Sequence, residues 1–310
     1  MKKYLILCLI GSMSYMQTNI SGYSIFDYSN DSINSGFDIK RAYLIYSNDI
    51  SEDLFFKIRF DVGRTSTDVL TTYLKNAYID WKCDNGDKFS MGLIGTNSYA
   101  VQEKNWGYRF IEKSALDKYG ATNTADFGIG YSKTFGQIKA NLQLLNGEGY
   151  KATNTNNKQA LYISIVYGET KLNTNDGMNL GLIINYSPEE DKTSYNHLVG
   201  SFVGCSSKNL RFGVEHNEFK EKQYKSTKKI SSLYTNYTLS NSWDIFMRHD
   251  IHDWKLSDPS YTPGGFNEYD SGEVTILGGV WNPTKGLYIS PNMHIDNNVN
   301  SYYFTFMFKY

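Results

Sequence analysis

The sequence is poor in cysteine and proline, has no excess of charge of either sign, and lacks long apolar runs. Its 310 residues include only 3 cysteines and 5 prolines. So few cysteines do not make a disulfide framework, and so few prolines leave room for many uninterrupted strands. The 31 basic and 32 acidic residues nearly balance, so no nucleic acid or other polyionic partner is indicated. Because a membrane-spanning helix needs about 20 consecutive apolar residues, the sequence excludes a helical membrane protein.

The chain is instead rich in aromatic residues and glycine. Aromatic residues make up 15% of the sequence, including 26 tyrosines, and there are 26 glycines. Tyrosine and β-branched residues are typical of strands. The mean hydropathy of −0.47 is polar, and a transmembrane β-barrel can be this polar because half of each strand faces water.

The N-terminus is the exception to this polarity. Two lysines precede an apolar stretch at residues 4–10, which is the pattern of a secretory signal peptide. Small residues follow, and they put the expected cleavage between Ser14 and Ser21. We therefore expect a signal peptide over residues 1–20 and a single mature domain over residues 21–310. The alternative is that the apolar stretch is a short buried strand.

The C-terminus carries the clearest strand pattern of the chain. Its aromatic side chains share one parity, at Tyr302, Phe304, Phe306, Phe308 and Tyr310. Alternation with period two places them on one face of a strand. In a soluble sandwich this face would be core. A final strand with a terminal aromatic in phase also resembles the assembly signal of outer-membrane proteins, which implies recognition by the barrel assembly machinery.

The same alternation recurs along the chain, with charged residues on the second face of several strands. These residues are Lys57, Arg59, Asp61, Arg211, Glu215, Arg248 and Asp250. A soluble sandwich would turn this face to bulk water, whereas a membrane barrel turns it to a polar lumen. On the second reading these seven residues form the pore wall, and their mixed signs predict a transverse field across it.

The pattern predicts an all-β fold with about 16 strands, in a single transmembrane antiparallel β-barrel. The expected strands lie near residues 21–28, 37–47, 53–63, 72–82, 88–96, 125–133, 137–146, 160–168, 178–187, 195–204, 208–217, 229–239, 242–252, 272–281, 285–294 and 301–310. Fourteen strands are the alternative, because residues 21–28 and 284–295 have the weakest pattern. An even number places both termini on one side of the membrane.

The lengths of the connections favour a barrel over a sandwich. Connections near residues 47–52, 83–87, 134–136, 205–207, 240–241 and 282–285 are short, and 169–177 is longer. The intervening connections, at 97–124, 147–159, 187–194, 218–228 and 254–271, are long. Outer-membrane barrels have short periplasmic turns and long external loops, and a sandwich has no reason to sort its loops by parity. Lysines at 218–228 predict a solvated external loop there.

The longest strand-free segment, residues 97–124, is expected to be the third external loop. Its aromatic residues argue against disorder. Its charged residues include Lys104, Arg109, Glu112, Lys113, Asp117 and Lys118. We expect the loop to fold into the lumen and these residues to form a pore constriction. The alternative is a lid over the mouth of the barrel.

Several phrases of the sequence resemble a known family. EKNWGYRFIEKSALDKYG at 103–120, TADFGIGYSK at 124–133 and LQLLNGEGY at 142–150 are similar to the phosphate-selective porin O and P family and related Gram-negative outer-membrane porins. Residues 246–253 and 281–292 look similar to late strands of that group. The resemblance covers roughly residues 37–310.

The resemblance implies a 16-stranded channel, usually trimeric, with the third loop constricting the pore. It implies diffusion of ions and small hydrophilic solutes, including anions such as phosphate, through the outer membrane. The expected partners are outer-membrane lipid, these solutes and two further copies of the chain. The sequence departs from anion-selective members in having only six arginines, at positions 41, 59, 64, 109, 211 and 248.

No motif for catalysis, for a cofactor or for a metal is present in the sequence. The five histidines include His249 and His252, which a strand would place on opposite faces. No nucleophile elbow, HExxH motif or phosphate loop occurs. We therefore expect a channel and not an enzyme, with no cofactor. The alternative function is a surface-exposed ligand-binding or adhesin barrel without an open channel.

Overall fold

The computed structural model describes residues 18–30, 35–65, 67, 69–153, 157–188, 195–221, 226–256 and 271–310. Most of the predicted signal peptide lies outside these residues, and the first strand begins inside the expected cleavage window. Within the described residues the strands are β1 (Thr18–Asn30), β2 (Ser35–Asp49), β3 (Leu54–Arg64), β4 (Leu70–Lys82), β5 (Lys88–Gly95), β6 (Ala125–Phe135), β7 (Ile138–Leu145), β8 (Ala160–Gly168), β9 (Gly177–Pro188), β10 (Tyr195–Ser207), β11 (Leu210–Glu221), β12 (Ser226–Ser240), β13 (Trp243–Leu256), β14 (Gly272–Thr284), β15 (Leu287–Asp296) and β16 (Val299–Lys309).

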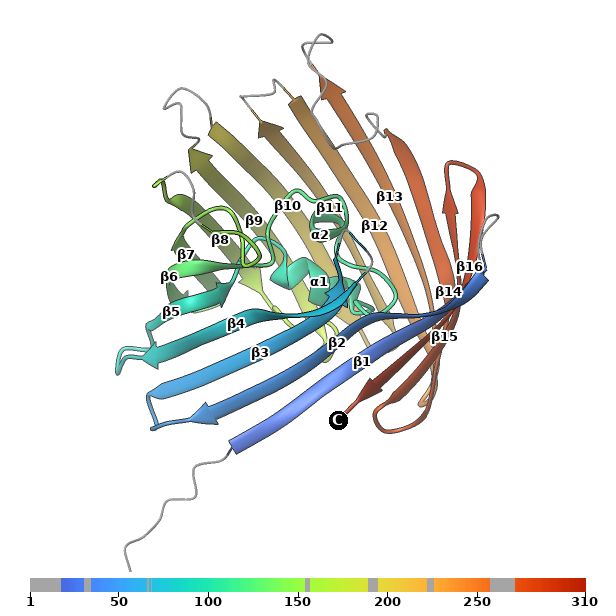
Figure 1. Cartoon of the computed structure of the whole chain (residues 1–310), viewed down its shortest axis with the longest axis horizontal. Coiled ribbons are helices and arrows are strands. Elements are labelled where there is room, and N and C mark those ends of the chain that lie inside the picture. The colour runs from blue at the N-terminus through green and yellow to red at the C-terminus, as the bar shows by residue number, and fades with distance from the viewer. Residues whose placement is uncertain are drawn as a thin grey trace, which may run out of the picture.

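The strands form one closed antiparallel barrel (Figure 1). Each strand pairs with its neighbours in sequence, and β1 closes the ring against β16 from Tyr23 opposite Lys309 to Asn30 opposite Tyr302. The prediction of 16 strands is confirmed, and both the 14-stranded barrel and the sandwich are wrong. The two strands with the weakest sequence pattern, β1 and β15, are present.

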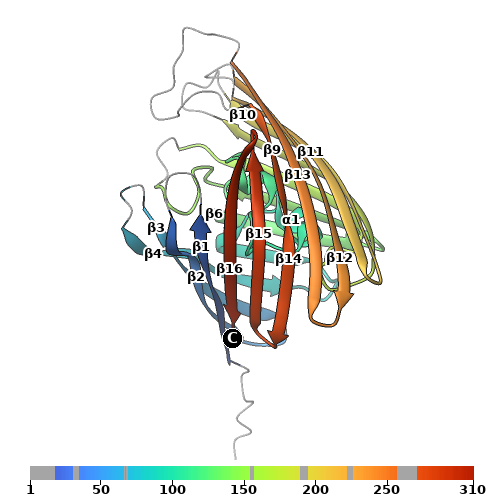
Figure 2. The ribbon, with the colours of Figure 1, turned by 90° about the vertical axis from the view of Figure 1, so that its right-hand side faces the viewer.

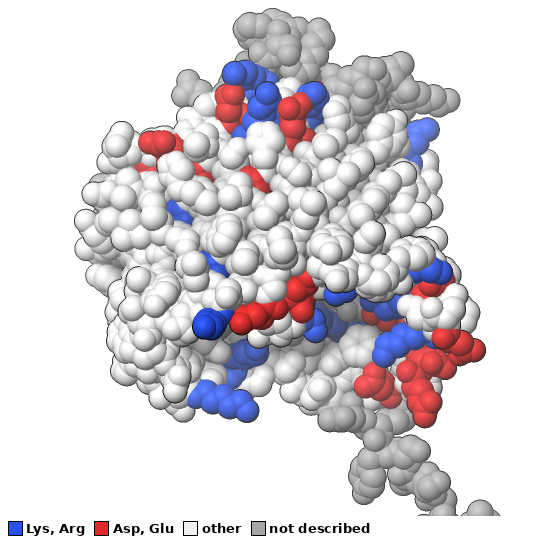
Figure 3. All heavy atoms as spheres, turned by 180° about the vertical axis from the view of Figure 1, so that it is seen from behind, with Lys and Arg blue, Asp and Glu red and all other residues white. Residues whose placement is uncertain are grey.

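The outer wall of the barrel is apolar and the inner wall is polar. On β9 the outward residues Leu180, Leu182 and Ile184 are 56%, 42% and 37% exposed, while Asn179 and Asn185 point inward and are buried. Figure 3 shows a broad expanse of uncharged side chains, with charged groups mainly near its upper and lower edges. This is the reverse of a soluble protein and fits a strand wall that faces hydrocarbon.

The aromatic stripe of β16 lies on the outer wall. Tyr302, Phe304 and Phe308 are 54%, 41% and 47% exposed, whereas Thr305 between them is fully buried. Phe304 packs on Phe306 with 4.9 Å between ring centroids. The stripe is therefore not the core of a soluble domain.

The two rims of the barrel differ in their connections. On one, the short-turn rim, residues 50–53, 83–87, 136–137, 208–209, 241–242 and 285–286 link the strands, and only 169–176 is longer. The other, the long-loop rim, carries 96–124 and 146–159, but also a tight turn. Asn297 and Asn298 join β15 to β16 there with φ of 46° and 71°, as a type I′ turn requires.

One predicted loop is wrong. The external loop expected at 218–228 is mostly strand, because β11 continues to Glu221 and β12 begins at Ser226. Glu218 and Lys220 both lie on the outer face of β11, so the alternating pattern of the strand continues through them. Lys228 points inward, with its Nζ 3.8 Å from the centroid of the Trp254 ring.

Two short helices, α1 (Ala100–Trp106) and α2 (Ala115–Lys118), belong to the connection between β5 and β6. Both lie within the ring of strands (Figures 1 and 2). Gly107 ends α1 with φ +80°, and its N–H donates to the Glu103 carbonyl over 2.8 Å. In the described residues no helix is long and apolar enough to cross a membrane.

The outward position of Phe304 gives a testable prediction. The Phe304→Arg substitution would place a charge against hydrocarbon near the middle of β16, at a cost of about 2–4 kcal/mol. We expect less folded protein in the outer membrane, measured by heat-modifiable migration on gels. Phe304→Leu is the control and should fold normally. Equal amounts of folded protein for the arginine variant and the control would show that this face does not contact lipid.

Candidate functional site

The loop at residues 97–124 is anchored to the inner wall by an aromatic cluster. Trp106 is 1% exposed and packs against Tyr234 and Phe246, with ring centroids 6.0 and 5.7 Å away. Its indole N–H donates to the carbonyl of Glu112 over 3.0 Å, which fixes the turn after α1. Tyr108 and Phe110 extend the same cluster toward β14 and β15.

A second apolar cluster holds the other end of the loop. Leu116 and Ala115 of α2 are fully buried and belong to one core cluster with Ile183, Phe202 and Ile230 of the wall. Together the two clusters join the loop to the inner faces of β8 to β16 and of β1. Apolar residues on the lumen side of these strands are thus explained by the loop that covers them.

Buried charges add polar anchors under the loop. Arg248 and Asp250 are 1% and 0% exposed and form an ion pair with atoms 2.7 Å apart. Arg248 also donates to the Lys113 carbonyl, and Asp250 accepts hydrogen bonds from Ser232 and from Tyr119, at 2.6 and 3.2 Å. Lys118 lies 4.0 Å from Asp250. These predicted wall residues do point inward, but they hold the loop instead of facing water.

Glu215 and Arg211 are likewise covered. Glu215 is 2% exposed and accepts a hydrogen bond from Asn217 over 3.1 Å. Arg211 lies 5.5 Å from the Tyr108 ring centroid and donates to the Trp106 carbonyl over 3.3 Å. Arg211 therefore supports the loop from the wall, whereas Glu215 bonds within β11.

The opposite side of the loop faces a charged part of the wall on β2 to β4. Asp61 is fully buried and lies 3.1 Å from Arg41 and 3.5 Å from Lys75. It also accepts a hydrogen bond from Tyr150 over 3.1 Å. Arg59 lies over the Tyr43 ring, 5.5 Å from its centroid.

Three charged side chains of the loop point toward this wall. Arg109 forms ion pairs with Glu103 at 2.9 Å and with Asp117 at 3.5 Å. Burial opposes the charge of Arg109, but Glu103, Tyr43 and Asp117 outweigh it and raise the pKa of the guanidinium group. Burial raises the pKa of the Glu103 carboxyl, although Arg109 acts in the opposite direction.

We call the residues that meet here the loop–wall cluster, which comprises Arg41, Arg59, Asp61 and Lys75 of the wall and Glu103, Arg109 and Asp117 of the loop. Glu103 is close enough to Lys75 and Arg59 for electrostatic interaction across the gap. The side chains of Arg41, Glu103 and Arg109 remain 19%, 28% and 20% exposed, so water reaches the cluster.

Of the remaining predicted residues, Lys57 lies on the same wall as this cluster, whereas Glu112, Lys113 and Lys118 lie at the Arg248–Asp250 anchor. Lys57 points inward from β3, two residues before Arg59. Glu112 lies 3.8 Å from Lys118. Burial acts to raise the pKa of Glu112, but Lys118 and Arg248 outweigh burial, and the pKa is lowered. Lys113 contributes its carbonyl to the anchor.

A basic group lies below the loop, toward the short-turn rim. Lys104 of α1 and Lys139 of β7 line a cavity of about 480 Å³. Lys139 donates to the Thr170 hydroxyl over 3.0 Å, which brings Lys171 close. Burial and the like charges of Lys171 and Lys139 lower the pKa of Lys104. Among the described residues, none of these three lysines forms a salt bridge.

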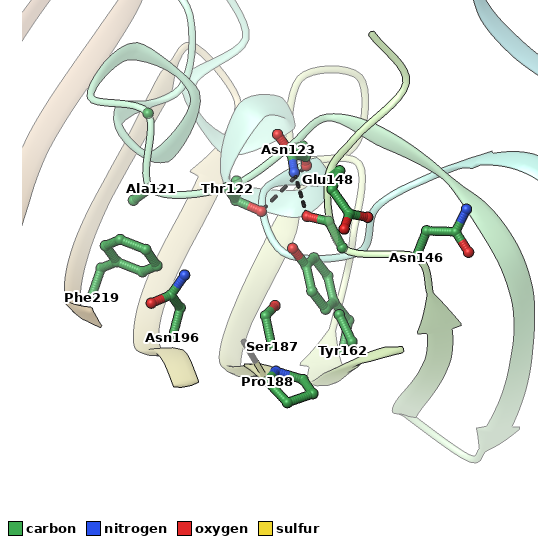
Figure 4. A pocket seen from close by; sticks show the side chains of 13 residues that line it. Ala121, Thr122, Asn123, Asn146, Glu148, Tyr162, Ser187, Pro188, Asn196 and Phe219 are labelled. Carbon is green, nitrogen blue, oxygen red and sulfur yellow. Dashed lines mark hydrogen bonds between the residues drawn. The ribbon is translucent and has the colours of Figure 1, made fainter. Parts of the chain in front are cut away.

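Another cavity, of about 310 Å³, lies where the loop returns to β6 (Figure 4). At the edge of this cavity, Asn123 joins the loop at 97–124 to the connection at 146–159, because its side chain donates to the Gly147 carbonyl over 3.0 Å. Tyr162, Ser187 and Glu148 also line it. These hydroxyl, amide and carboxylate groups can exchange hydrogen bonds with a polar solute.

The described residues contain no group of three or more His, Cys, Asp or Glu side chains that could hold a metal ion. The lumen thus presents charges and hydrogen-bonding groups lining a barrel. The sequence matches the family model described as phosphate-selective porin O and P over residues 14–213, which is more than half of the chain.

The chain belongs to this family. It is an outer-membrane porin of a Gram-negative bacterium and forms a diffusion channel. The family consists of channel proteins and not of enzymes. The late-strand phrases at 246–253 and 281–292 lie outside the matched range. No curated protein sequence matches the chain.

Solved structures share the fold of this porin. OmpF of Salmonella typhi, described in complex with daunomycin, is 8% identical, with a TM-score of 0.69 over 94% of this chain and 97% of that one. OmpT of Vibrio cholerae, described in a trimer form, is 11% identical, with a TM-score of 0.66 over 95% and 99%. The channel DcaP of Acinetobacter baumannii is 10% identical, with a TM-score of 0.65 over 96% and 99%.

Sequence reasoning did not assign Arg41 and Lys75 of the porin to the lumen. Each lies at a break in alternation, since the register of β1 with β2 shifts between Ile25 and Phe26 and that of β3 with β4 shifts between Arg59 and Phe60. A β-bulge adds one residue to a strand and changes which face the following residues occupy. Lys75 is itself the extra residue of β4, and Arg41 directly follows Lys40, the extra residue of β2, so alternation is interrupted at both places and no other sequence signal replaces it.

The raised pKa of Glu103 predicts a pH dependence of the porin's selectivity. Because a carboxyl with a raised pKa loses its charge at a higher pH than ordinary glutamate, acidification makes the loop–wall cluster more positive. We expect selectivity to move toward anions as the pH falls from 7, measured by reversal potentials in a salt gradient. Glu103→Gln should remove this part of the shift, and Asp117→Asn should retain it. An unchanged pH profile in Glu103→Gln would contradict the assignment.

Proposed function

We propose that ions and small hydrophilic solutes cross this porin between the loop and the β2–β4 wall, through the loop–wall cluster. The observation that carries this proposal is the division of the loop into two sides. One side packs against β8 to β16 and β1 through the Trp106 and Leu116 clusters. The other presents partly exposed charges to a charged wall. A hydrated ion finds charged, partly exposed partners from both the loop and the wall on the second side.

The loop is then the pore constriction. Charges of opposite sign alternate on both sides of the proposed path. On the loop, Arg109 lies between Glu103 and Asp117. On the wall, Asp61 lies between Arg41 and Lys75. In a narrow lumen these charges are poorly screened compared with the Debye length of about 8 Å in physiological saline. Each therefore acts strongly on a passing ion.

We propose a modest preference for anions, including phosphate. The loop–wall cluster contains four cationic and three anionic side chains. The three lysines at 104, 139 and 171 add positive charge toward the short-turn rim. Outer-membrane barrels place their short turns in the periplasm, so an anion leaving the cluster would meet these lysines on the periplasmic side.

We further propose that the porin assembles as a homotrimer. The Vibrio cholerae OmpT structure with the same fold is described as a trimer. The aromatic face of β16 remains the proposed signal for the barrel assembly machinery, since Phe304 and Phe308 are exposed on the outer wall. Residues 1–20 remain the proposed signal peptide, with cleavage between Ser14 and Ser21.

Reversing the charge of Arg109 tests the path. Arg109→Glu converts four positive and three negative charges in the cluster into an excess of negative charge. We expect the reversal potential in a KCl gradient to change toward cation selectivity. Lys229→Glu, on the outer face of β12, is the control and should change it much less. Equal shifts in both variants would show that ions do not pass Arg109.

Shortening the loop tests the constriction. Replacing residues 104–118 with a short glycine–serine linker removes both anchors and the charged side of the loop. We expect a larger single-channel conductance in planar bilayers, because the lumen is no longer partly filled. Heat-modifiable migration should verify that the barrel still folds. Unchanged conductance in a folded variant would show that the loop is not the constriction.

A further inference from the structure

The connection between β8 and β9 differs from the rest of the short-turn rim. It comprises residues 169–176, whereas the other described connections on that rim have two to five residues. Its fold is internally fixed: the N–H groups of Thr174 and Asn175 both donate to the Lys171 carbonyl over 2.9 Å. The Glu169 carboxylate accepts hydrogen bonds from the Lys171 N–H and the Asn175 side chain, at 2.8 and 3.0 Å.

This connection turns into the barrel and reaches the loop helix α1. Leu172 is only 1% exposed, which is unusual for a residue in a turn at a rim. Gly204 of β10 explains how it fits. A Cβ atom at this glycine would lie 2.8 Å from Leu172 Cδ1 and 2.5 Å from Asn105 Nδ2. The missing side chain therefore makes room for the turn and the end of α1 together.

A chain of side-chain amides links the turn to the helix. Asn179 donates to the Glu169 carbonyl over 2.6 Å. Asn179 and Asn105 also exchange two hydrogen bonds of 2.9 Å each, and both side chains are buried. Because Asn105 lies in the last turn of α1, this contact joins the helix to the base of the 169–176 turn.

Arg211 forms a second link between the same two segments. One guanidinium nitrogen donates to the Leu172 carbonyl over 3.5 Å and another to the Trp106 carbonyl over 3.3 Å. The approach requires glycine at position 107, where a Cβ atom would lie 2.3 Å from Arg211 Nη2. Arg211 thus bridges the turn and the C-terminus of α1.

We propose that the turn at 169–176 is a brace that positions α1, so that the short-turn rim sets the width and steadiness of the constriction. This inference rests on the proposed path between the loop and the β2–β4 wall. Leu172, Asn179 and Arg211 are its positioning residues. They hold Asn105 and Trp106 from the side of the short-turn rim. Glu103, on the same helix, belongs to the loop–wall cluster.

The test is single-channel recording of the full-length porin with Leu172→Ala. Loss of the buried side chain leaves α1 without its support, so we expect several-fold more open-channel noise and closure at lower voltage. Leu210→Ala is the matched control, since Leu210 lies near the same rim but is 45% exposed on the outer wall. Leu172→Met, which keeps a large apolar side chain, should leave the open-channel noise at the wild-type level. Identical recordings for Leu172→Ala and wild type would overturn the brace.

A second variant separates positioning from general destabilisation. In the porin whose residues 104–118 are replaced by a linker, α1 is disrupted and the brace has nothing to hold. Leu172→Ala should then add no further noise. If the noise increases equally in that background, the residue acts on the barrel and not through α1. If the linker variant alone leaves conductance unchanged, the proposal that the loop is the constriction is wrong, whatever the result for Leu172→Ala.

Discussion

A strand in hydrocarbon has no water for its N–H and C=O groups, so every edge must be paired. The closure of β1 against β16 meets this requirement, and the rest of the molecule follows from it. A closed antiparallel ring alternates apolar and polar side chains on each strand. A ring of 16 strands is too wide for wall side chains alone to fill. Such a ring leaves an aqueous channel, and the loop at 97–124 occupies part of it (Figures 1 and 2).

The attachment of that loop determines where charges meet water. Trp106 and Leu116 bury the loop against one half of the wall, and Arg248 with Asp250 supplies a buried pair beneath it. Removing one partner of such a pair costs about 3–5 kcal/mol because the other is left buried and uncompensated. The anchor thus tolerates little change. The other side of the loop, with Arg109, keeps partly exposed charges and is the side on which the proposed path lies.

Periodicity could predict the barrel because each strand is long and one face is lipid-exposed. All 16 strands, the outward β16 stripe and the inward position of Arg59 and Asp61 follow from parity alone. The same rule could not distinguish Arg59, in the loop–wall cluster, from Arg248, under the loop, because burial depends on which part of the wall the loop contacts. That contact is a tertiary property of Trp106, which a single sequence does not reveal. Bulges hid Arg41 and Lys75.

The distribution of the six arginines bears on what the porin does to anions. Strong phosphate binding relies on guanidinium groups that can form paired hydrogen bonds to the oxyanion. Here Arg41, Arg64, Arg109 and Arg248 already pair with carboxylates, and Arg211 is held by backbone carbonyls. Conduction requires binding weak enough for release. Neutralised arginines interleaved with acids fit fast passage of mixed solutes better than tight capture of one, so the proposed anion preference would rest on Arg59 and the lysines.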